Sequence, residues 1–431
     1  MRLKYLFACL SWFSILFSWA QTSPKEVFDK VERSGGVYYA YPYQEIGVHS
    51  APPKGYKPFY ISHLGRHGSR YLIDDADYKN TLDLLASAES QSALTPLGKD
   101  VYHRLLKVWD EVEWRGGDLS PLGVREQRGI AERMFERYPE VFRDEANITA
   151  YSTTIVRCVL SMDAFSERLK ESNPKLHIYR DASVFHQRYL NHHTEEAIAF
   201  RSAKDTWREE YRKFEDQHIQ PDALMTRLFS DSNFVRKKVN PKEVMIALFE
   251  IANNMQNIET DVSFYDIFEK QELFDLWQCK NYKLYVNDAN AALNGGLMFE
   301  NCKPLLKQMI ADAENMIDNG GYGANFRFAH DGNIIPLVML LHLKDTYNSV
   351  DNPADFYKAW SDFKIAPMAG NVQLVFYKHE KTKDILVKFL LHENEITVPP
   401  IAGQNLPYYY RWEDVKAFYL SLINEGQPKS K

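Results

Sequence analysis

Residues 58–70 have the sequence PFYISHLGRHGSR. The run PFYISHL over 58–64 is apolar, β-branched and aromatic and stops at a glycine, which predicts a buried strand. The turn GRHGSR that follows, over 65–70, is dense in charge. Because ligands of α/β sheets bind at the carboxyl ends of strands, this turn is a candidate binding site.

Two predicted helices lie downstream of this turn. Each begins with a hydroxyl residue followed by proline and continues with helical spacing of apolar residues. Thr95 and Ser120 are the expected N-caps, and Pro96 and Pro121 occupy the first helical positions, where proline is favoured. Two similar helix starts do not make a repeat protein, so we treat them as separate elements.

The rest of the chain alternates between strands and helices around a long helical excursion. Residues 146–153 predict a strand that leads at Thr153 or Thr154 into a helix. Residues 183–300 carry long helical patterns rich in Lys, Glu, Arg and Asn. A helix over 303–319 then resumes the alternation. Further strands are expected over 325–331, 372–378 and 385–393, the last two as an antiparallel pair.

These patterns predict an α/β fold, namely a split α/β domain with a central sheet flanked by helices and an inserted, mainly α-helical cap domain. The expected order is a signal peptide, the first part of the α/β domain, the cap, and the second part of the α/β domain. The corresponding residues are 1–20, 21–182, 183–300 and 301–431.

Composition restricts the class of protein. The 431 residues are 45% apolar and 26% charged, which is typical of a globular protein large enough for two domains. The formal net charge of −6 has no cationic excess, so we expect no nucleic-acid partner. No segment after the first twenty residues is apolar enough to cross a bilayer.

The first twenty residues resemble a secretory signal peptide. They have a basic start, an apolar stretch and a small residue, Ala20, after which a signal peptidase could cut before Gln21. We therefore expect an exported protein, periplasmic or secreted, with no stable membrane span after removal of the signal. A retained anchor is the alternative, although the apolar stretch is shorter than the ~20 residues that a span needs. Attachment of a lipid at Cys9 is a further alternative.

The cysteines allow at most one intramolecular disulfide in the mature chain. Beyond Cys9 the sequence has Cys158, Cys279 and Cys302. We expect Cys279 and Cys302 to be the pair if a disulfide forms. Three buried thiols are the alternative, because free cysteine is among the most buried residue types.

Three predicted strand ends carry side chains suited to phosphate chemistry. Arginines stay charged and offer N–H donors in a plane that match phosphate oxygens. A neutral imidazole can attack phosphorus and hold it covalently, and a neighbouring Asp can protonate the departing oxygen. The three clusters are Arg66, His67 and Arg70, then Arg157, then His330 and Asp331.

Each residue alone has a structural alternative. An Arg at a strand end is commonly a surface ion-pair partner, and His-Asp is a common dipeptide. His63 and His67 are four residues apart, but Gly65 and the preceding strand argue against the helix that a zinc motif requires. We therefore expect no metal and no cofactor.

A basic stretch of the cap region gives a further substrate-binding candidate. Arg201, Lys204, Arg208 and Arg212 fall on one face of a predicted helix. Such residues are commonly solvated or packed. If this face borders the binding site instead, Arg201 and Arg208 would contact an anionic substrate.

The motifs together resemble the histidine acid phosphatases, which form branch 2 of the histidine phosphatase superfamily. Residues 66–70 resemble the family's RHGxR signature, and 152–157 its S-T-x-x-x-R segment. Residues 119–123 resemble its L-T-P-x-G helix start, 328–331 its F-A-H-D block and 367–371 its late P-x-A-x-N strand. The resemblance covers about residues 55 to 170 and 300 to 395, whereas the helical middle matches in position only.

The resemblance implies a phosphoglycerate-mutase-like fold and a phosphohistidine mechanism without cofactor or metal. His67 would be the nucleophile and Asp331 the proton donor. The phosphate clamp would consist of Arg66, Arg70, Arg157 and His330. Three positions depart from the family pattern, and they put the shape of the pocket in doubt rather than the reaction: Leu72, Tyr151 and Cys158 stand where Pro, Arg and Thr are usual.

The substrate is expected to be a small phosphate monoester. The sequence RHGSRY, the long SPLGVREQRGIAERM helix and Pro336 resemble the multiple inositol polyphosphate phosphatases, which favours inositol polyphosphates such as phytate. That branch usually carries His-Ala-Glu, whereas this chain has His330-Asp331-Gly332, the donor type of ordinary acid phosphatases and phytases. A broad-specificity or sugar-phosphate acid phosphatase is one alternative. A non-catalytic periplasmic phosphate-ester binding protein is another.

Overall fold

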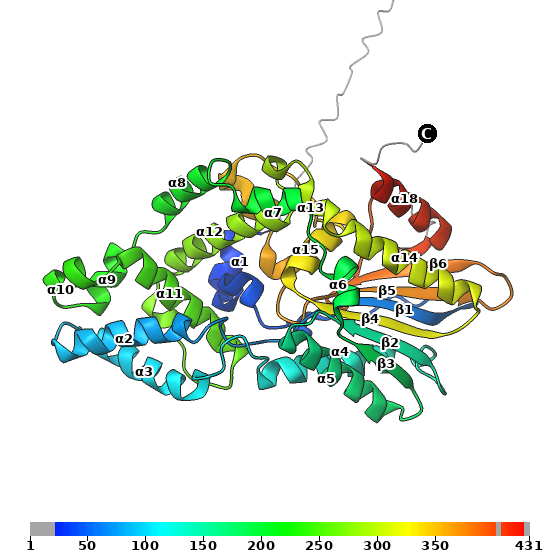
Figure 1. Ribbon diagram of the computed structural model, residues 1–431, viewed down its shortest axis with the longest axis horizontal. Coiled ribbons are helices and arrows are strands. Elements are labelled where there is room, and N and C mark those ends of the chain that lie inside the picture. Colours follow the sequence, from blue (N-terminus) through cyan, green and yellow to red (C-terminus); the bar gives the residue numbers. More distant parts are fainter. Residues whose placement is uncertain (1–21, 402–406, 426–431) are drawn as a thin grey trace, which may run out of the picture.

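The computed structural model describes residues 22–401 and 407–425 and has the predicted α/β fold (Figure 1). The predicted signal peptide lies outside these residues. The strands are β1 (Tyr56–Arg66), β2 (Asn147–Ser152), β3 (His177–Asp181), β4 (Gly323–Ala329), β5 (Asn371–His379), β6 (Ile385–Leu391), β7 (Asn394–Ile396) and β8 (Tyr409–Arg411).

The helices of the first half are α1 (Pro24–Asp29), the 3₁₀ helix η1 (Val31–Tyr38), α2 (Ala76–Ser90), α3 (Pro96–Val112), α4 (Pro121–Arg137), α5 (Val156–Ser172), α6 (Val184–Leu190) and α7 (Glu195–Ser202). Those of the second half are α8 (Arg208–His218), α9 (Asp222–Leu228), α10 (Ser232–Lys238), α11 (Pro241–Asn254), α12 (Lys270–Asp288), α13 (Leu297–Glu300), α14 (Lys303–Asp318), α15 (Asp331–Leu340), α16 (Phe356–Ala359), α17 (Asp362–Ile365) and α18 (Trp412–Asn424).

The strands form one mixed sheet in the order β3-β2-β4-β1-β5-β6-β7, and β8 pairs with β6. Strands β1 to β4 pair in parallel, whereas β5 pairs antiparallel to both β1 and β6, so the predicted antiparallel pair is confirmed. In the parallel part, Arg66 lies opposite Ala329 and Ser152 opposite Phe328. The three predicted clusters therefore meet at one edge of the sheet.

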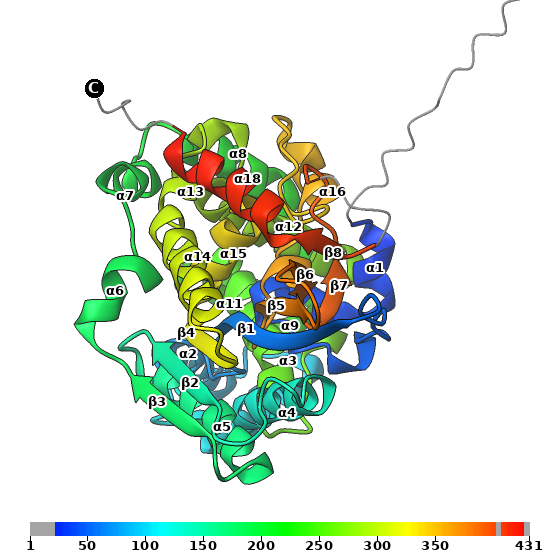
Figure 2. The same cartoon turned by 90° about the vertical axis from the view of Figure 1, so that its right-hand side faces the viewer.

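Helices cover both faces of the sheet. Helices α4 and α5 lie on one side and α14 and α18 on the other (Figure 2). A hydrophobic cluster fills the space between the sheet and α4 and α5; it includes Ile130, Phe165, Phe326 and Phe328. The ring of His63 packs against Phe165, Phe326 and Phe328. His63 is therefore a residue of this core.

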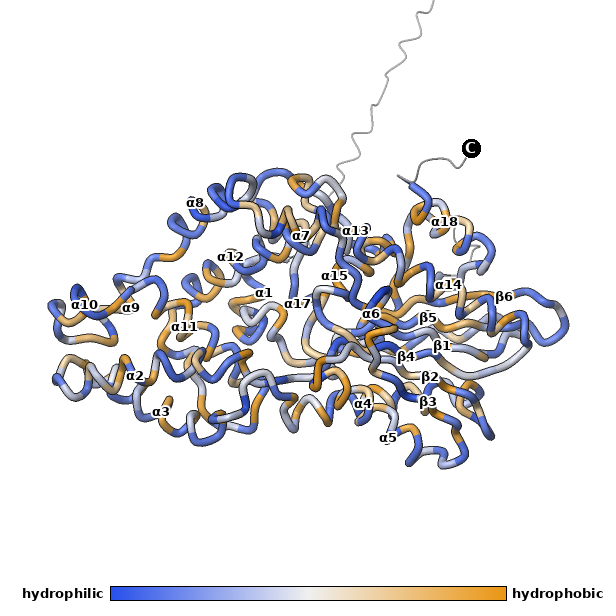
Figure 3. The backbone as a smooth tube through the Cα atoms, in the orientation of Figure 1, coloured by the Kyte–Doolittle hydropathy of each residue, from blue (hydrophilic) through white to orange (hydrophobic). Residues whose placement is uncertain are grey.

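A helical lobe extends beyond the edge of the sheet at which the three predicted clusters meet. It contains α8 to α12 and also α2 and α3, which come before residue 183 and pack against α11 and α9 (Figure 1). The tube at α8 is mostly hydrophilic (Figure 3), which agrees with Phe214 being its one buried residue. The extent of the inserted segment, residues 183–300, stays a prediction.

The predicted helix starts are partly confirmed. The hydroxyls of Thr95 and Ser120 accept hydrogen bonds from the backbone N–H groups of Gly98 and Gly123, at 3.0 and 3.2 Å. Helix α5, however, begins at Val156, later than the predicted start at Thr153 or Thr154. The reason is that the N–H of Thr153 continues the strand by bonding the carbonyl of Phe328.

Two further expectations are corrected. Cys158, Cys279 and Cys302 are all free and buried, so the alternative of three buried thiols holds and the 279–302 pair is wrong. The four basic residues of the cap do not share one helix, because α7 ends at Ser202 and α8 begins only at Arg208. In the described part of the chain, no helix is long and apolar enough to span a membrane.

Candidate active site

The turn after β1 is held by a close approach of two glycines. A Cβ on Gly68 would overlap the backbone of Gly123 at the start of α4, and a Cβ on Gly123 would overlap the backbone of Ser69. The Ser120 N–H and hydroxyl both bond the Ser69 carbonyl, at 2.9 and 3.0 Å. The RHG and SPLG motifs therefore pack directly against each other.

His67, the predicted nucleophile, is buried and held in its neutral form. Its side chain is buried, and Nδ1 lies 2.8 Å from the carbonyl oxygen of Gly68. Because a carbonyl oxygen only accepts, Nδ1 carries the hydrogen and the lone pair resides on Nε2. Burial and the charges of Arg66, Arg70 and Arg157 hold the pKa of His67 well below its usual value.

Arg66 is buried at the end of β1 and joins two segments to the site. One of its terminal nitrogens, Nη1, donates to the carbonyls of Val37 and Ala366, and Nη2 donates to Oδ2 of Asp331 at 3.0 Å. Asp331, the first residue of α15, also accepts from the N–H of Gly332 at 2.9 Å. Arg66, which precedes the predicted nucleophile in the chain, thus holds the predicted proton donor.

Arg70 is oriented by Tyr38, which lies at the end of η1. The Arg70 Nη2 donates to the Tyr38 hydroxyl at 3.0 Å, and the guanidinium lies 4.8 Å from the centre of the tyrosine ring. Arg157, in the first turn of α5, donates weakly to the carbonyl of Gly117 at 3.4 Å. Both arginines therefore have donors to spare.

In the described part of the chain, the three arginines each keep an unpaired donor, as Arg104, Arg227 and Arg327 outside the site also do. Although buried, the Nε atoms of Arg66, Arg70 and Arg157 have no hydrogen-bond partner among the described residues. A buried unpaired donor is costly, and charged donors more so. Three such arginines close to a neutral imidazole form a site suited to a tetrahedral oxyanion.

His330 completes the site. It is the N-cap residue of α15, and its ring centre lies 5.6 Å from that of His67. Its Nε2 lies 3.2 Å from the hydroxyl of Thr153, and the Sγ of Cys158 lies 3.7 Å away and donates to the carbonyl of Ala329. Burial and the nearby arginines lower the pKa of His330 to about 4.

The structure brings all six predicted catalytic and phosphate-clamp residues together and adds residues that the sequence did not indicate. Glu126 on α4 is buried and accepts from the N–H of Ser69 at 2.7 Å and from its hydroxyl at 2.8 Å. Asn254, the last residue of α11, donates to the carbonyl of Arg70 at 2.9 Å. The amide oxygen of Asn257 lies 2.8 Å from the Ser69 hydroxyl, whose single hydrogen it shares with Glu126. The helical lobe thus hydrogen-bonds directly to the turn after β1, residues 67–70, which we call the catalytic turn.

A cavity of about 420 Å³ adjoins the clamp on the side of the helical lobe. Tyr38 and Val37, which contact Arg70 and Arg66, lie in its wall. Cationic side chains from α7, α8 and α12 line the same space: Arg201, Arg208, Lys280 and Lys283. Glu250, Asp288 and Asp362 also line the cavity, so its cations are partly neutralised.

The two predicted cap arginines differ in how far they are neutralised. Arg201 pairs with Asp288 at 2.6 Å. Arg208 donates to the backbone carbonyls of Ala203 and Arg201, at 2.9 and 2.8 Å, and has no acidic partner among the described residues. The structure thus places both at the cavity, although the helix that was expected to carry them is broken.

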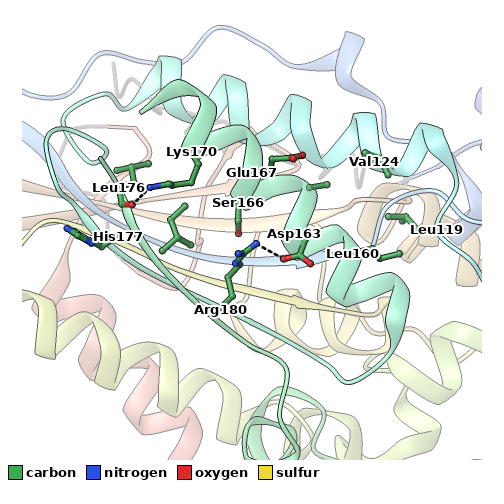
Figure 4. Close-up of a pocket in the computed structure, with 12 residues that line it drawn as sticks. Leu119, Val124, Leu160, Asp163, Ser166, Glu167, Lys170, Leu176, His177 and Arg180 are labelled. Atoms are coloured by element: carbon green, nitrogen blue, oxygen red, sulfur yellow. Dashed lines mark hydrogen bonds and ion pairs between the residues drawn. The ribbon is translucent and has the colours of Figure 1, made fainter. Parts of the chain in front are cut away.

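A larger cavity, about 840 Å³, lies away from these residues, between α5 and β3 (Figure 4). Two of its charged groups pair with each other, Arg180 with Asp163 at 2.8 Å, and Lys170 donates to the carbonyl of Leu176. None of the predicted site residues lines it. The larger of these two cavities is therefore not the one beside the candidate site.

Comparisons with solved structures agree with this fold. The multiple inositol polyphosphate phosphatase of Bifidobacterium longum, in complex with inositol hexasulfate, superposes with a TM-score of 0.74 at 16% identity, over 90% of this chain and 97% of that one. The phytase of D. castellii gives 0.61 at 14% identity over 92% and 86%. The apo phytase of Hafnia alvei gives 0.53 at 12% identity over 86% and 98%.

No curated protein sequence matches the chain significantly. The model of the histidine phosphatase superfamily (branch 2), however, matches residues 61–392, which include every residue of the site from Arg66 to Asp331. The chain therefore belongs to branch 2 of the histidine phosphatase superfamily and is a phosphomonoester hydrolase.

Proposed function

We propose that the protein is an exported histidine acid phosphatase that hydrolyses inositol polyphosphates, phytate among them, through a phosphohistidine intermediate on His67. The observation that carries this proposal is the convergence of Arg66, Arg70 and Arg157 on a buried imidazole, whose pKa burial and their charges lower. Export rests on the character of residues 1–20.

The proposed reaction has two steps. The lone pair on Nε2 of His67 attacks phosphorus while the bond to the ester oxygen breaks, and Asp331 gives its proton to that oxygen. A water molecule then attacks the phosphohistidine, its proton passes to the Asp331 carboxylate, and inorganic phosphate leaves. Arg66, Arg70, Arg157 and His330 hold the phosphoryl oxygens throughout.

Substrate binding changes the proton affinity of Asp331. Burial alone would raise the pKa of Asp331, but Arg66, Arg70, His330 and the N–H of Gly332 hold it below its usual value. A phosphate dianion among the same arginines offsets their charge. The proton affinity of the carboxyl group therefore rises when the substrate is bound.

A substrate with several phosphates is favoured by the cavity beside the clamp. The clamp can hold one phosphoryl group, and the cations of the cavity can meet others on the same ring. The B. longum enzyme, similar to this chain in fold, was solved with inositol hexasulfate, a polyanion of that kind. A sugar-phosphate or broad-specificity phosphatase would gain nothing from these cations.

Product profiling tests the proposal. The purified protein should release phosphate from phytate in preference to glucose 1-phosphate, and should also hydrolyse p-nitrophenyl phosphate. Preference for glucose 1-phosphate or for no ester in particular would favour the broader phosphatase. A protein that binds phosphate esters but releases nothing from any of them would be the non-catalytic binding protein.

The lowered pKa of His67 predicts an unusual pH profile. The imidazole attacks only in its neutral form, which predominates above its pKa. An ordinary imidazole would be mostly protonated at pH 5, at a cost of roughly thirtyfold in rate. Because the pKa is held well below 6.5, kcat/KM for p-nitrophenyl phosphate should not fall between pH 7 and pH 5. A fall centred near 6.5 would show that the imidazole is not held neutral.

The cavity arginines predict a substrate-dependent effect. Arg208→Ala should raise KM for an inositol polyphosphate by roughly tenfold, the equivalent of about 1.4 kcal/mol, and change KM for p-nitrophenyl phosphate little. Arg201→Ala should act in the same direction but less, since Arg201 is already paired with Asp288. Arg212→Ala, an exposed arginine of the same helix α8, is the matched control. Equal effects on both substrates would place Arg208 outside the substrate site.

A further inference from the structure

One side of helix α4 hydrogen-bonds to the backbone around the predicted nucleophile. Glu126 and Gln127 follow Gly123, where the catalytic turn approaches α4 closely, by three and four residues, so all three lie on one side of the helix. The Nε2 of Gln127 donates to the carbonyl of Arg66 at 2.8 Å. The carboxyl group of Glu126 accepts from the N–H of Ser69 at 2.7 Å. Helix α4 therefore holds the backbone both before and after the nucleophile.

The N–H that Glu126 holds belongs to the same peptide unit as the carbonyl that holds His67. This unit joins Gly68 to Ser69. Its carbonyl oxygen lies 2.8 Å from Nδ1 of His67, and its N–H donates to Oε2 of Glu126. Because the C=O and N–H of a trans peptide point in opposite directions, the unit connects the imidazole on one side with the carboxyl group on the other.

The groups that face Glu126 require an acceptor at each of its two oxygens. The side chain is buried, Oε2 accepts from the N–H of Ser69, and Oε1 accepts from the N–H of Tyr41 at 3.0 Å. A backbone N–H can only donate. A glutamine could serve only one of the two N–H groups, because its other terminal atom is itself a donor. The position is therefore built for a carboxyl group.

We infer that Glu126 is a positioning residue for the nucleophile; this rests on the proposed function, in which His67 attacks phosphorus. Glu126 fixes the peptide unit between Gly68 and Ser69. That unit keeps the imidazole hydrogen on Nδ1 and therefore leaves the lone pair on Nε2, the atom that attacks. Glu126 acts through this peptide rather than on the imidazole or the phosphoryl group directly.

The same contact favours the reaction itself. As Nε2 of His67 forms its bond to phosphorus and the bond to the ester oxygen breaks, the hydrogen stays on Nδ1 and the ring becomes positively charged. A carbonyl that accepts from Nδ1–H stabilises this charge. Donation from the N–H of the same peptide to Glu126 makes that carbonyl a stronger acceptor. In serine proteases an Asp holds the catalytic imidazole in its tautomer directly, whereas here a peptide unit stands between the two.

Other bonds hold the turn in the absence of Glu126. The N–H of His67 donates to the carbonyl of Ala329 at 3.0 Å, and the N–H of Gly68 donates to the hydroxyl of Ser161 at 3.1 Å. Neither bond reaches the peptide unit between Gly68 and Ser69. A substitution of Glu126 should therefore release this unit while the turn keeps its place.

The test is Glu126→Leu, which fills a similar volume but offers no acceptor. Its kcat/KM, which reports formation of the phosphoenzyme, should fall roughly ten- to hundredfold, as for other partners that orient a functional imidazole. The loss should be equal for an inositol polyphosphate and p-nitrophenyl phosphate, because both need the same nucleophile. The inhibition constant of inorganic phosphate should change little, since Gln127 still holds the backbone of Arg66.

The hydrogen on Nδ1 gives a readout that destabilisation of the fold alone would not move. In the NMR spectrum of protein made with isotope-labelled histidine, the Nδ1–H signal of His67 is identified by its absence from His67→Ala. It should move upfield in Glu126→Leu. In Glu126→Gln, whose amide oxygen can still accept from the N–H of Ser69, the signal and kcat/KM should both lie between those of the wild type and Glu126→Leu.

Glu393→Leu is the matched control. Glu393 is likewise a buried glutamate, but it accepts from the Tyr41 hydroxyl at 2.9 Å and from Arg133 at 2.6 Å rather than from the catalytic turn. Its replacement should lower the unfolding temperature and leave kcat/KM and the Nδ1–H signal at their wild-type values.

Two results would overturn the inference. One is a folded Glu126→Leu that keeps the wild-type kcat/KM and Nδ1–H signal. The other is a loss confined to phosphate affinity, which would make Glu126 a support of the clamp instead. If Glu126→Leu does not fold, wild-type values in Glu126→Gln count in the same way. A wild-type protein that hydrolyses neither ester would instead overturn the proposed function.

Discussion

His67→Ala should abolish the hydrolysis of both an inositol polyphosphate and p-nitrophenyl phosphate. Without the imidazole no phosphoenzyme can form, whichever group leaves. In a well-studied serine protease, removal of the covalent nucleophile lowers kcat on the order of 10⁶-fold. A loss of similar order would bring turnover to the background rate. The measurement is phosphate release from both substrates under conditions in which the wild type is saturated.

Binding separates this result from misfolding. The clamp arginines do not depend on the imidazole, because Arg66 is held by the carbonyls of Val37 and Ala366 and Arg70 by Tyr38. The variant should therefore still bind inorganic phosphate and unfold at a similar temperature. A folded variant that keeps more than a trace of turnover would show that the reaction does not pass through His67.

Asp331→Asn should discriminate between the two substrates. An inositol phosphate leaves as a strongly basic alkoxide, so a proton must arrive as the bond breaks, an aid worth ~10²- to 10⁴-fold. A nitrophenolate leaves readily without it. The variant should lose that factor on the inositol phosphate and little on p-nitrophenyl phosphate, as long as formation of the phosphoenzyme limits the rate.

The ratio of kcat/KM for the two substrates, in wild type and in Asp331→Asn, is the quantity to measure. The amide can still accept from Arg66 and from the N–H of Gly332, so the anchoring geometry should persist. A ratio that does not change would mean that another group is the donor.

The proximity of the candidate catalytic residues could be predicted from the sequence because their signals are local. Arg66, His67 and Arg70 lie within five residues, and each further cluster follows a strand with a clear apolar pattern. The parallel pairing of β1, β2 and β4 then brings these ends to one edge. Strand pattern and motif therefore sufficed for the centre of the site.

The supporting residues could not be predicted in this way. Tyr38, Asn254 and Asn257 reach the catalytic turn from segments that carry no motif, and a buried asparagine at a helix end has the same sequence signal as a solvated one. Their role follows from packing of the helical lobe against the turn, which no local pattern encodes.

The break between α7 and α8 shows another limit. No proline or glycine interrupts residues 195–218, so the periodicity predicts one continuous helix. The chain turns because other donors satisfy the last carbonyls of α7. Trp207 donates to the carbonyl of Phe200 and is buried, and Arg208 donates to those of Ala203 and Arg201. Burial of Trp207 thus competes with helix continuation.

The position of β1 in the sheet has a consequence for folding and synthesis. Tyr60 pairs on one side with Gly323 of β4 and on the other with Phe376 of β5, so neither neighbour of β1 exists until most of the chain has been made. Contacts between such distant segments slow folding. During synthesis, the backbone N–H and C=O groups of β1 stay unpaired. They can then pair with strands of other chains. Arg66 and His67 therefore gain their final setting only after β4 and β5 have docked, and truncation before residue 371 should leave an inactive, aggregation-prone chain.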